Sequence, residues 1–239
     1  KTSACLYLQS PNFFGQLEEV EQGAELIHSV GAKLIVGCNP IALGLLKTPA
    51  EQGADIAVGE GQPLGMPLSF GGPYLGFMAA TSAMMRKLPG RIVGETTDVD
   101  GKRAFVLTLQ AREQHIRREK ASSNICSNQA LCAMTAAVYL AAMGPQGLRQ
   151  AAILCYQKAH YLAEQLASVP GVTLKYQGSF FHEFVTEQKD SEKLLAALEK
   201  QGILGGYPLE DGSILWCATE KNTKEDMDRV VEIIRKELM

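Results

Sequence analysis

The fold is decided by a strand–helix–strand unit near the start of the chain, where residues 4–36 read ACLYLQSPNFFGQLEEVEQGAELIHSVGAKLIV. Short apolar runs at residues 4–8 and 33–36 predict strands, and apolar residues at helical spacing over residues 17–30 predict the helix between them. A third short apolar run follows at residues 55–58. Apolar strands that alternate with helices indicate a parallel sheet covered by helices on both faces, so we predict an α/β fold.

The C-terminal half of the sequence predicts a smaller α+β domain joined to the first part by a long helix. This helix is expected to begin near Ser127, to break at Gly144-Pro145 and then to continue. Shorter strands and helices follow, and Thr223–Asp226 resembles a capping box before the last helix. We therefore expect a large-domain part over residues 1–135 and a small domain with the connecting helix over residues 136–239.

An apolar Gly/Pro-rich loop and a hairpin are expected between these two parts. Residues 59–76 contain six Gly and three Pro, and no charged residue occurs from Gly61 to Met85. Such a loop is expected to be buried or packed on a partner, because long exposed apolar loops are rare in monomers. The strand expected at residues 74–80 should be buried as well. Asp100-Gly101 predicts a two-residue hairpin turn.

The composition is that of a globular protein, with 46% hydrophobic and 21% charged residues. A net charge of −3 predicts no broad attraction to nucleic acid or to an anionic membrane. The six Cys show no CxxC pair and no Cys/His spacing typical of zinc sites, so we expect reduced, mostly buried thiols in a cytoplasmic protein. The longest strongly apolar run, residues 130–143, is shorter than the ~17–25 residues of a membrane-spanning helix, so we expect a soluble protein. Because the chain begins at Lys1 without a Met or a signal peptide, we expect a fragment cut within a domain.

Two candidate anion sites depend on backbone and side-chain donors. Gly71 and Gly72 could present backbone N–H groups to a phosphate, although a tight turn packed on a neighbouring chain explains them equally well. Ser122, Ser123 and Asn124 precede the long helix and could donate hydrogen bonds to an anion at its N-terminus. A plain N-cap is the alternative.

Two further candidates depend on nucleophilic or titratable side chains. Cys126 lies near a helix start, where a thiolate is stabilised, and His115 is eleven positions upstream; a buried thiol is the alternative. His28, His160 and His182 could act in acid–base catalysis, or could be packed or surface residues. None of these forms a convincing catalytic constellation from the residues alone.

Three stretches resemble the glycine cleavage system P-protein (glycine dehydrogenase, decarboxylating). They are residues 53–76, GADIAVGEGQPLGMPLSFGGPYLG, residues 88–94, LPGRIVG, and residues 109–126, LQAREQHIRREKASSNIC. The resemblance covers essentially the whole chain and corresponds to the C-terminal part of subunit 1 (alpha). It implies the aminotransferase-like fold of pyridoxal-phosphate enzymes (fold type I), with part of a large domain followed by a small one. The family reaction decarboxylates glycine and passes the aminomethyl group to the lipoyl arm of the H-protein, with pyridoxal phosphate as the electron sink.

The sequence departs from the lysine-bearing half of that family at one position. There, a His-Lys pair ends the strand before a Gly-Gly-Pro segment. Aligning Gly71-Gly72-Pro73 with that segment puts Gly61 and Gln62 in place of the pair. An amide nitrogen is not a nucleophile, and no Lys lies between Lys47 and Lys87. We therefore expect no catalytic residue in this chain and no activity from the fragment alone.

The resemblance then implies an alpha subunit in a heterotetramer whose beta subunit holds the cofactor. Ser122, Ser123 and Asn124 would contact the phosphate of the partner's pyridoxal phosphate, and the loop with Gly71 and Gly72 would approach the same interface. The implied partners are the beta subunit and lipoylated H-protein, with glycine as the substrate of the complex. Two alternatives stay open: a non-catalytic module that recruits H-protein, and an autonomous pyridoxal-phosphate enzyme.

Overall fold

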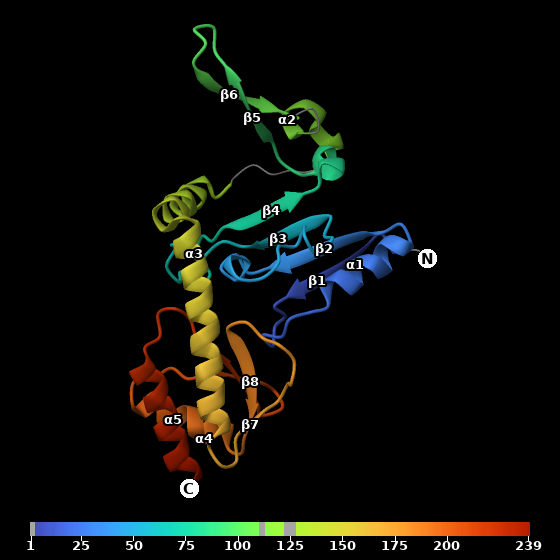
Figure 1. Cartoon of the computed structure of the whole chain (residues 1–239). Coiled ribbons are helices and arrows are strands. Elements are labelled where there is room, and N and C mark those ends of the chain that lie inside the picture. Colours follow the sequence, from blue (N-terminus) through green and yellow to red (C-terminus); the bar gives the residue numbers. More distant parts are fainter. Residues whose placement is uncertain (1–2, 110–112, 122–127) are drawn as a thin grey trace.

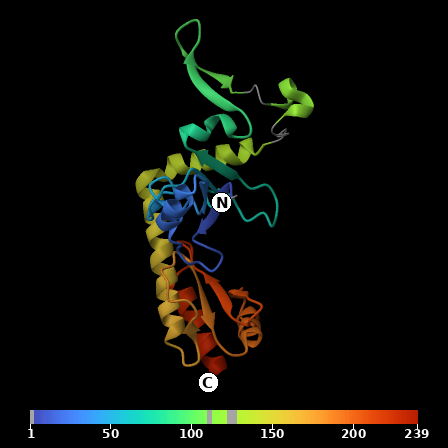
Figure 2. The ribbon, with the colours of Figure 1, turned by 90° about the vertical axis from the view of Figure 1, so that its right-hand side faces the viewer.

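The computed structural model describes residues 3–109, 113–121 and 128–239. Two sheets lie at opposite ends of a long helix, α3, and a hairpin projects from the end of the molecule that is far from the C-terminus (Figure 1). Figure 2 shows α3 running along one side of the molecule and joining both parts.

The first sheet is mostly parallel, as the sequence predicts. Its strands lie in the order β1 (Cys5–Ser10), β2 (Lys33–Cys38), β3 (Ile56–Glu60) and β4 (Gly76–Ala80). The first three are parallel and β4 runs antiparallel to β3. Helix α1 (Val20–Ser29) packs on β1 and β2, and its buried side chains contact the fully buried Leu34 and Val36 of β2. Burial of these apolar side chains fixes the register of the sheet against the helix.

Within the described residues, α1 covers one face of this sheet, and no comparable helix covers the other face. On the opposite face of β1, Tyr7 is 53% exposed and Cys5 is also exposed. The prediction of helices on both faces is therefore wrong for this chain. The reason is that the parallel connection from β2 to β3 contains only a 3₁₀ turn, and β3 connects to the antiparallel β4 through a loop without a helix.

The second sheet is antiparallel and belongs to the C-terminal part. Its strand order is β7 (Thr173–Leu174), β8 (Glu183–Glu187), β10 (Ile214–Cys217) and β9 (Tyr207–Pro208), and the helices are α4 (Ser191–Lys200) and α5 (Lys224–Leu238). Leu166, Leu198 and Ile214 are fully buried in the core between these helices, α3 and the sheet. The predicted capping box is confirmed, because Thr223 Oγ1 accepts from the Asp226 amide at 3.1 Å and the Asp226 carboxylate accepts in return.

Helix α3 (Ala130–Ala167) contains the predicted break, since Gly144 has φ 63° and ψ 179°. By length and composition it is, among the described residues, the one helix that could cross a membrane. Its buried residues lie mainly after the break and include Ala152 and Leu166. The domain boundary expected at residue 135 falls inside α3 and stays a prediction.

The hairpin consists of β5 (Ile92–Thr97) and β6 (Arg103–Thr108), which are antiparallel. Their connection spans residues 98–102, closed by a hydrogen bond from the Asp98 amide to the Lys102 carbonyl at 2.8 Å, so the predicted two-residue turn is wrong. Asp98 Oδ1 also accepts from two backbone amides of this connection, which stabilises the longer loop. The other short elements are the 3₁₀ turns η1 (Ala42–Gly44), η2 (Ser82–Lys87) and η3 (Arg118–Lys120) and the one-turn helix α2 (Gln114–Arg117).

One end of the Gly/Pro-rich loop is buried and the other is exposed, and β4 lies on the surface. Leu64 is buried in a core with Ala152, whereas Leu68 is 69% exposed, Phe70 is 95% exposed and Met78 of β4 is 50% exposed. The loop is therefore partly buried within the chain, and burial of the following strand was a wrong prediction. Packing of this loop on a partner stays a prediction.

The five described cysteines are free, and Cys155 is the only buried one among them. Cys5 and Cys217 are exposed, which contradicts the expectation of mostly buried thiols. Cys5 begins a strand with one open face, and Cys217 ends β10 at the margin of the second sheet.

Candidate functional site

A cavity of about 400 Å³ lies at the carboxyl ends of the parallel strands. Gln9 of β1, Cys38 of β2 and Glu60 of β3 each contribute to its wall. His182 and Glu183, at the start of β8, line it from the C-terminal part. Ligands of open α/β sheets bind outside the carboxyl ends of the strands, so this cavity is the candidate functional site.

The turn after β1 holds the C-terminal part against the sheet. Gly15 has φ 82°, and a Cβ there would lie 1.9 Å from the Glu183 carbonyl oxygen, so only glycine allows this approach. The Leu17 amide donates to the Ser179 carbonyl at 2.8 Å, and Gln16 forms a bridge with Phe180. These backbone contacts fix His182 and Glu183 at the edge of the cavity.

Glu60 organises the loop that follows β3. Its Oε1 accepts hydrogen bonds from the Gln62 amide at 3.0 Å and from the Leu75 amide at 2.7 Å. One carboxylate therefore binds backbone amides near both ends of the Gly/Pro-rich loop.

Gln62 lies two residues beyond the end of β3 and lines the cavity. Its side-chain Nε2 donates to the Met66 carbonyl at 2.7 Å, so the amide is engaged in holding the loop. Its equivalence to the Schiff-base lysine of the lysine-bearing half stays a prediction.

The cavity is neutral to acidic in character. Burial lowers the pKa of His182 to about 4, an effect that Glu220 only partly opposes, so the imidazole is neutral at physiological pH. Burial also raises the pKa of the Glu183 carboxyl and of the Cys38 thiol. No Lys or Arg occurs among the residues that line the cavity.

These residues do not fit pyridoxal phosphate. No lysine is present to form an imine with its aldehyde, and no cation lines the cavity to balance its phosphate. The carboxylate of Glu60 would instead repel an anion.

The structure does not bring the other predicted site residues into this cavity. The Gly72 amide donates to the Ser69 carbonyl at 2.8 Å within an exposed turn, and neither Gly71 nor Gly72 lines the cavity. Ser122, Ser123 and Asn124 lie outside the described residues, as does Cys126. Their contact with a partner's cofactor stays a prediction.

Two of the candidate histidines lie elsewhere, His28 on the surface and His160 packed in the C-terminal part. His28 Nε2 lies 2.8 Å from Asp55 Oδ2, which joins α1 to the loop before β3. The His160 ring stacks on Phe180 with ring centroids 3.9 Å apart. Both therefore support the fold, in agreement with the alternative of packed or surface residues.

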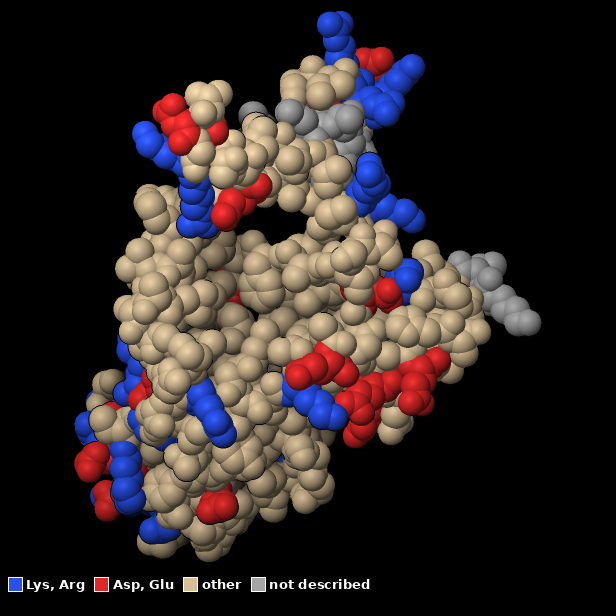
Figure 3. Space-filling view, turned by 45° about the horizontal axis from the view of Figure 1, so that its top comes forward, with Lys and Arg blue, Asp and Glu red and all other residues tan. Residues whose placement is uncertain are grey.

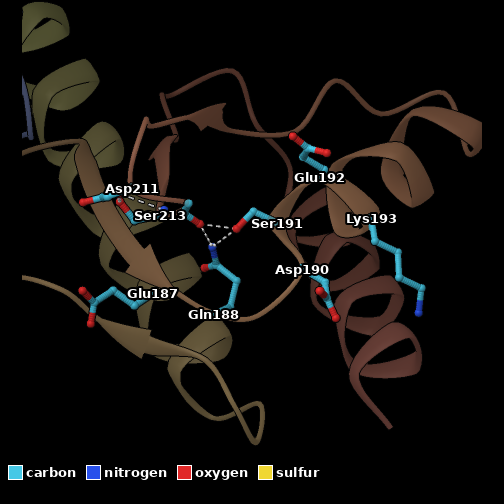
Figure 4. Close-up of a pocket in the computed structure, with 9 residues that line it drawn as sticks. Glu187, Gln188, Asp190, Ser191, Glu192, Lys193, Asp211 and Ser213 are labelled. Carbon is cyan, nitrogen blue, oxygen red and sulfur yellow. Dashed lines mark hydrogen bonds between the residues drawn. The ribbon is translucent and has the colours of Figure 1, made fainter.

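A larger cavity of about 570 Å³ lies at the far end of the C-terminal part (Figure 4). Its polar groups already bond one another: Gln188 Nε2 donates to Ser191 Oγ at 2.8 Å, and the Ser213 amide donates to Asp211 Oδ1 at 3.0 Å. These polar groups already have hydrogen-bond partners in the turn at residues 188–191 and in the turn before β10. The cavity is therefore assigned no ligand.

Sequence reasoning missed Glu60 and Glu183 and treated His182 as a packed or surface residue. Glu60 could have been found, because it ends a predicted parallel strand, where ligand sites lie. His182 and Glu183 carried no such signal, since their place at the cavity depends on how the two parts pack.

Solved structures with this arrangement define the class of the chain. An alanine–glyoxylate aminotransferase from Nostoc sp. superposes with a TM-score of 0.64 at 19% identity, covering 99% of this chain and 62% of that one. A crystal structure of glycine decarboxylase (P-protein) of the glycine cleavage system, in inhibitor-bound form, gives a TM-score of 0.92 at 45% identity, covering 98% of this chain and 55% of that one. The chain therefore has the aminotransferase-like fold of pyridoxal-phosphate-dependent enzymes, fold type I, as predicted.

The family model described as glycine cleavage system P-protein matches residues 1–234, and the chain belongs to this family. It is similar to the probable glycine dehydrogenase (decarboxylating) subunit 1 of Moorella thermoacetica, with 54% identity over 98% of this chain and 54% of that protein. The corresponding protein of Thermomicrobium roseum is 52% identical over the same shares of each chain. The chain thus spans about half the length of the curated relatives that it matches, and the resemblance seen in the sequence is confirmed.

Proposed function

We propose that this chain is part of the alpha subunit of a two-subunit glycine dehydrogenase (decarboxylating), and that it completes an active site whose pyridoxal phosphate is held by the other subunit. The observation that carries the proposal is Gln62. It lies just after a parallel strand, in a cavity without Lys or Arg, and its amide is bonded to Met66. Such a cavity cannot hold the cofactor covalently, whereas the relatives of this chain are named as one subunit of a decarboxylating enzyme.

The exposed apolar surface supports a partner subunit. Phe70 is 95% exposed in the Gly/Pro-rich loop, Phe105 is 63% exposed in the hairpin and Leu131 is 72% exposed at the start of α3. On the face shown in Figure 3, charged side chains lie mainly at the edges and few occur between them. Large exposed apolar side chains are typical of surfaces that a partner chain, or the rest of the subunit beyond these residues, covers in the assembly.

Within this proposal, Gly71 and Gly72 belong to the loop that meets the partner, and Ser122, Ser123 and Asn124 donate to the phosphate of the partner's cofactor. Glycine decarboxylation and aminomethyl transfer to the lipoyl arm of the H-protein then take place on the partner, in a cytoplasmic assembly. This chain contributes shape and hydrogen bonds without a catalytic residue of its own.

The main test locates the cofactor. The full-length subunit is mixed with its partner and pyridoxal phosphate, reduced with borohydride and digested. We expect a pyridoxyl label on a lysine of the partner and none on this chain. A labelled lysine in this chain would establish the autonomous enzyme instead.

A second test separates the proposal from a module that only recruits H-protein. The Ser123→Ala/Asn124→Ala double variant should weaken cofactor retention in the complex, whereas Ser29→Ala, whose hydroxyl donates to the Leu26 carbonyl of its own helix, should not. Unchanged retention in the double variant, together with unchanged H-protein binding, would favour the recruiting module.

A further inference from the structure

We propose that His182, Glu183 and Cys217 form a metal site that binds Zn²⁺. One potential ligand atom from each of these residues lies within 4.8 Å of the other two. No pair of the three has a spacing in the sequence that indicates zinc, so the site exists only in the folded chain.

Paired strands position Glu183 and Cys217, and His182 lies in the bend immediately before β8. Cys217 of β10 is the register partner of Glu183 of β8. The Ala218 amide donates to the His182 carbonyl at 3.0 Å, which extends the pairing by one step. Ligands on paired strands are held more precisely than ligands on loops, so little ordering is needed when a metal binds.

The imidazole of His182 has an unmet bonding requirement. Its Nδ1 is buried and has no hydrogen-bond partner among the described residues. A buried polar atom without a partner destabilises the fold, and such atoms are rare in folded proteins. A neutral imidazole nitrogen with an unused lone pair is a common metal ligand.

The donor set favours zinc over the harder cations. Imidazole and thiolate are ligands of Zn²⁺ and other late transition metals, whereas Mg²⁺ and Ca²⁺ require oxygen ligands. Three protein ligands leave one tetrahedral position for water. A thiolate and a carboxylate together balance the two positive charges of the ion, so the loaded site is neutral.

Metal binding must also ionise the thiol. The S–H bond breaks as the S–Zn bond forms, and the proton passes to solvent.

The site lies where the two parts of the chain meet. His182 and Glu183 also line the cavity at the carboxyl ends of the strands, and Gly15 of the first part contacts Glu183 directly. A bound ion would therefore stiffen the wall of that cavity. This inference depends on the three side chains alone and holds whether or not a partner subunit carries the cofactor.

The first experiment uses Co²⁺ as a spectroscopic substitute for Zn²⁺ in the metal-stripped full-length subunit. We expect one equivalent to bind with the near-ultraviolet charge-transfer band of a Co²⁺–thiolate bond. Cys217→Ser should abolish the band, and Cys5→Ser, which changes another exposed thiol, should retain it. Absence of the band in the unaltered protein would overturn the proposal.

Zinc affinity then tests the ligand set. Loss of an outer partner of a metal ligand weakens binding 10–100-fold, so Cys217→Ser or His182→Ala should weaken Zn²⁺ binding by more than about 100-fold. Equal affinity in the Cys217→Ser variant would overturn the proposal. Should a variant fail to fold, alkylation of the unaltered protein gives the same answer: Zn²⁺ should protect Cys217 from iodoacetamide and leave Cys5 reactive, whereas equal labelling of Cys217 with and without Zn²⁺ would contradict the site.

Discussion

The C-terminal region (residues 151–239) and the middle region (residues 67–140) differ in how they bury apolar side chains. In the C-terminal region, Leu166, Leu198 and Ile214 are fully buried in one core. In the described residues of the middle region, only Glu113 and Ala136 are buried, while large apolar side chains such as Phe70 and Leu131 are exposed. Both regions contain apolar sequence, but only one of them provides enough neighbours within the chain.

The difference separates two sources of stability. The C-terminal region gains its free energy from burial against its own helices and sheet. The middle region is a hairpin with a few short turns and half of a helix, and a two-stranded hairpin is marginally stable in water without further packing. We therefore expect the middle region to gain its packing from the rest of the subunit or from a partner chain.

The largest expected effect comes from making the same substitution, Leu to Ala, in both regions. Leu198→Ala removes a fully buried side chain from the C-terminal core, so it should lower the free energy of unfolding by about 2–5 kcal/mol. Leu131→Ala removes a side chain that is 72% exposed and should change it by no more than about 0.5 kcal/mol. Urea unfolding of the full-length subunit measures both, and equal losses would remove the contrast.

The next effect concerns pH and the first sheet, one face of which packs on α1 within the chain. Burial alone would raise the pKa of the Asp55 carboxyl, but hydrogen bonds from Lys33 Nζ, the Leu34 amide and His28 outweigh burial and hold it at about 2. Because the folded-state pKa lies below the unfolded value, the stabilisation is present above about pH 4 and is lost as the pH falls towards 2. Asp55→Asn should therefore cost about 2 kcal/mol at neutral pH and progressively less below pH 4, measured by denaturant unfolding at each pH.

Asp100→Asn is the matched control in the middle region. This carboxylate is on the exposed hairpin connection, 3.8 Å from Lys102 Nζ, and an exposed ion pair of this kind contributes little. A loss as large as that of Asp55→Asn would show that the hairpin has its own stabilising charge network.

A smaller effect is expected on association with the partner subunit. Truncating an apolar side chain at the centre of an interface typically costs more than 1 kcal/mol, and 1.4 kcal/mol corresponds to a tenfold change in Kd. Leu68→Ala/Phe70→Ala should therefore weaken association about tenfold or more and leave the lone subunit as stable as before. Leu204→Ala, which removes a 96% exposed side chain from the C-terminal region, should leave association unchanged. Analytical ultracentrifugation of the mixed subunits measures all three, and no change in the double variant would place the partner elsewhere.

The smallest effect lies at the start of α5. Thr223→Ala removes the side-chain acceptor of the capping box and should lower the free energy of unfolding by about 1 kcal/mol. Thr223→Ser keeps the hydroxyl and should retain most of that stability. Thermal unfolding followed by circular dichroism checks both, and equal Tm values would show that this helix end is stabilised by packing alone.

The sequence predicted the elements whose signals are local. The period of the apolar residues gave α1 and the parallel strands, and Gly144-Pro145 gave the break in α3. The hairpin turn and β4 were predicted less well. The length of the turn depends on the side-chain bonds of Asp98, and the exposure of β4 depends on which neighbours the sheet has.

What the sequence determined by itself is chemical identity at fixed positions. Gln62 cannot act as an amine in any fold, and the motifs around it define the family. Only the tertiary structure decided that His182 and Glu183 close the cavity at the strand ends and that Cys217 lies beside them. The physical reason is that these residues meet through long-range strand pairing and docking of the two parts, and the free energy of such contacts comes from packing the whole domain.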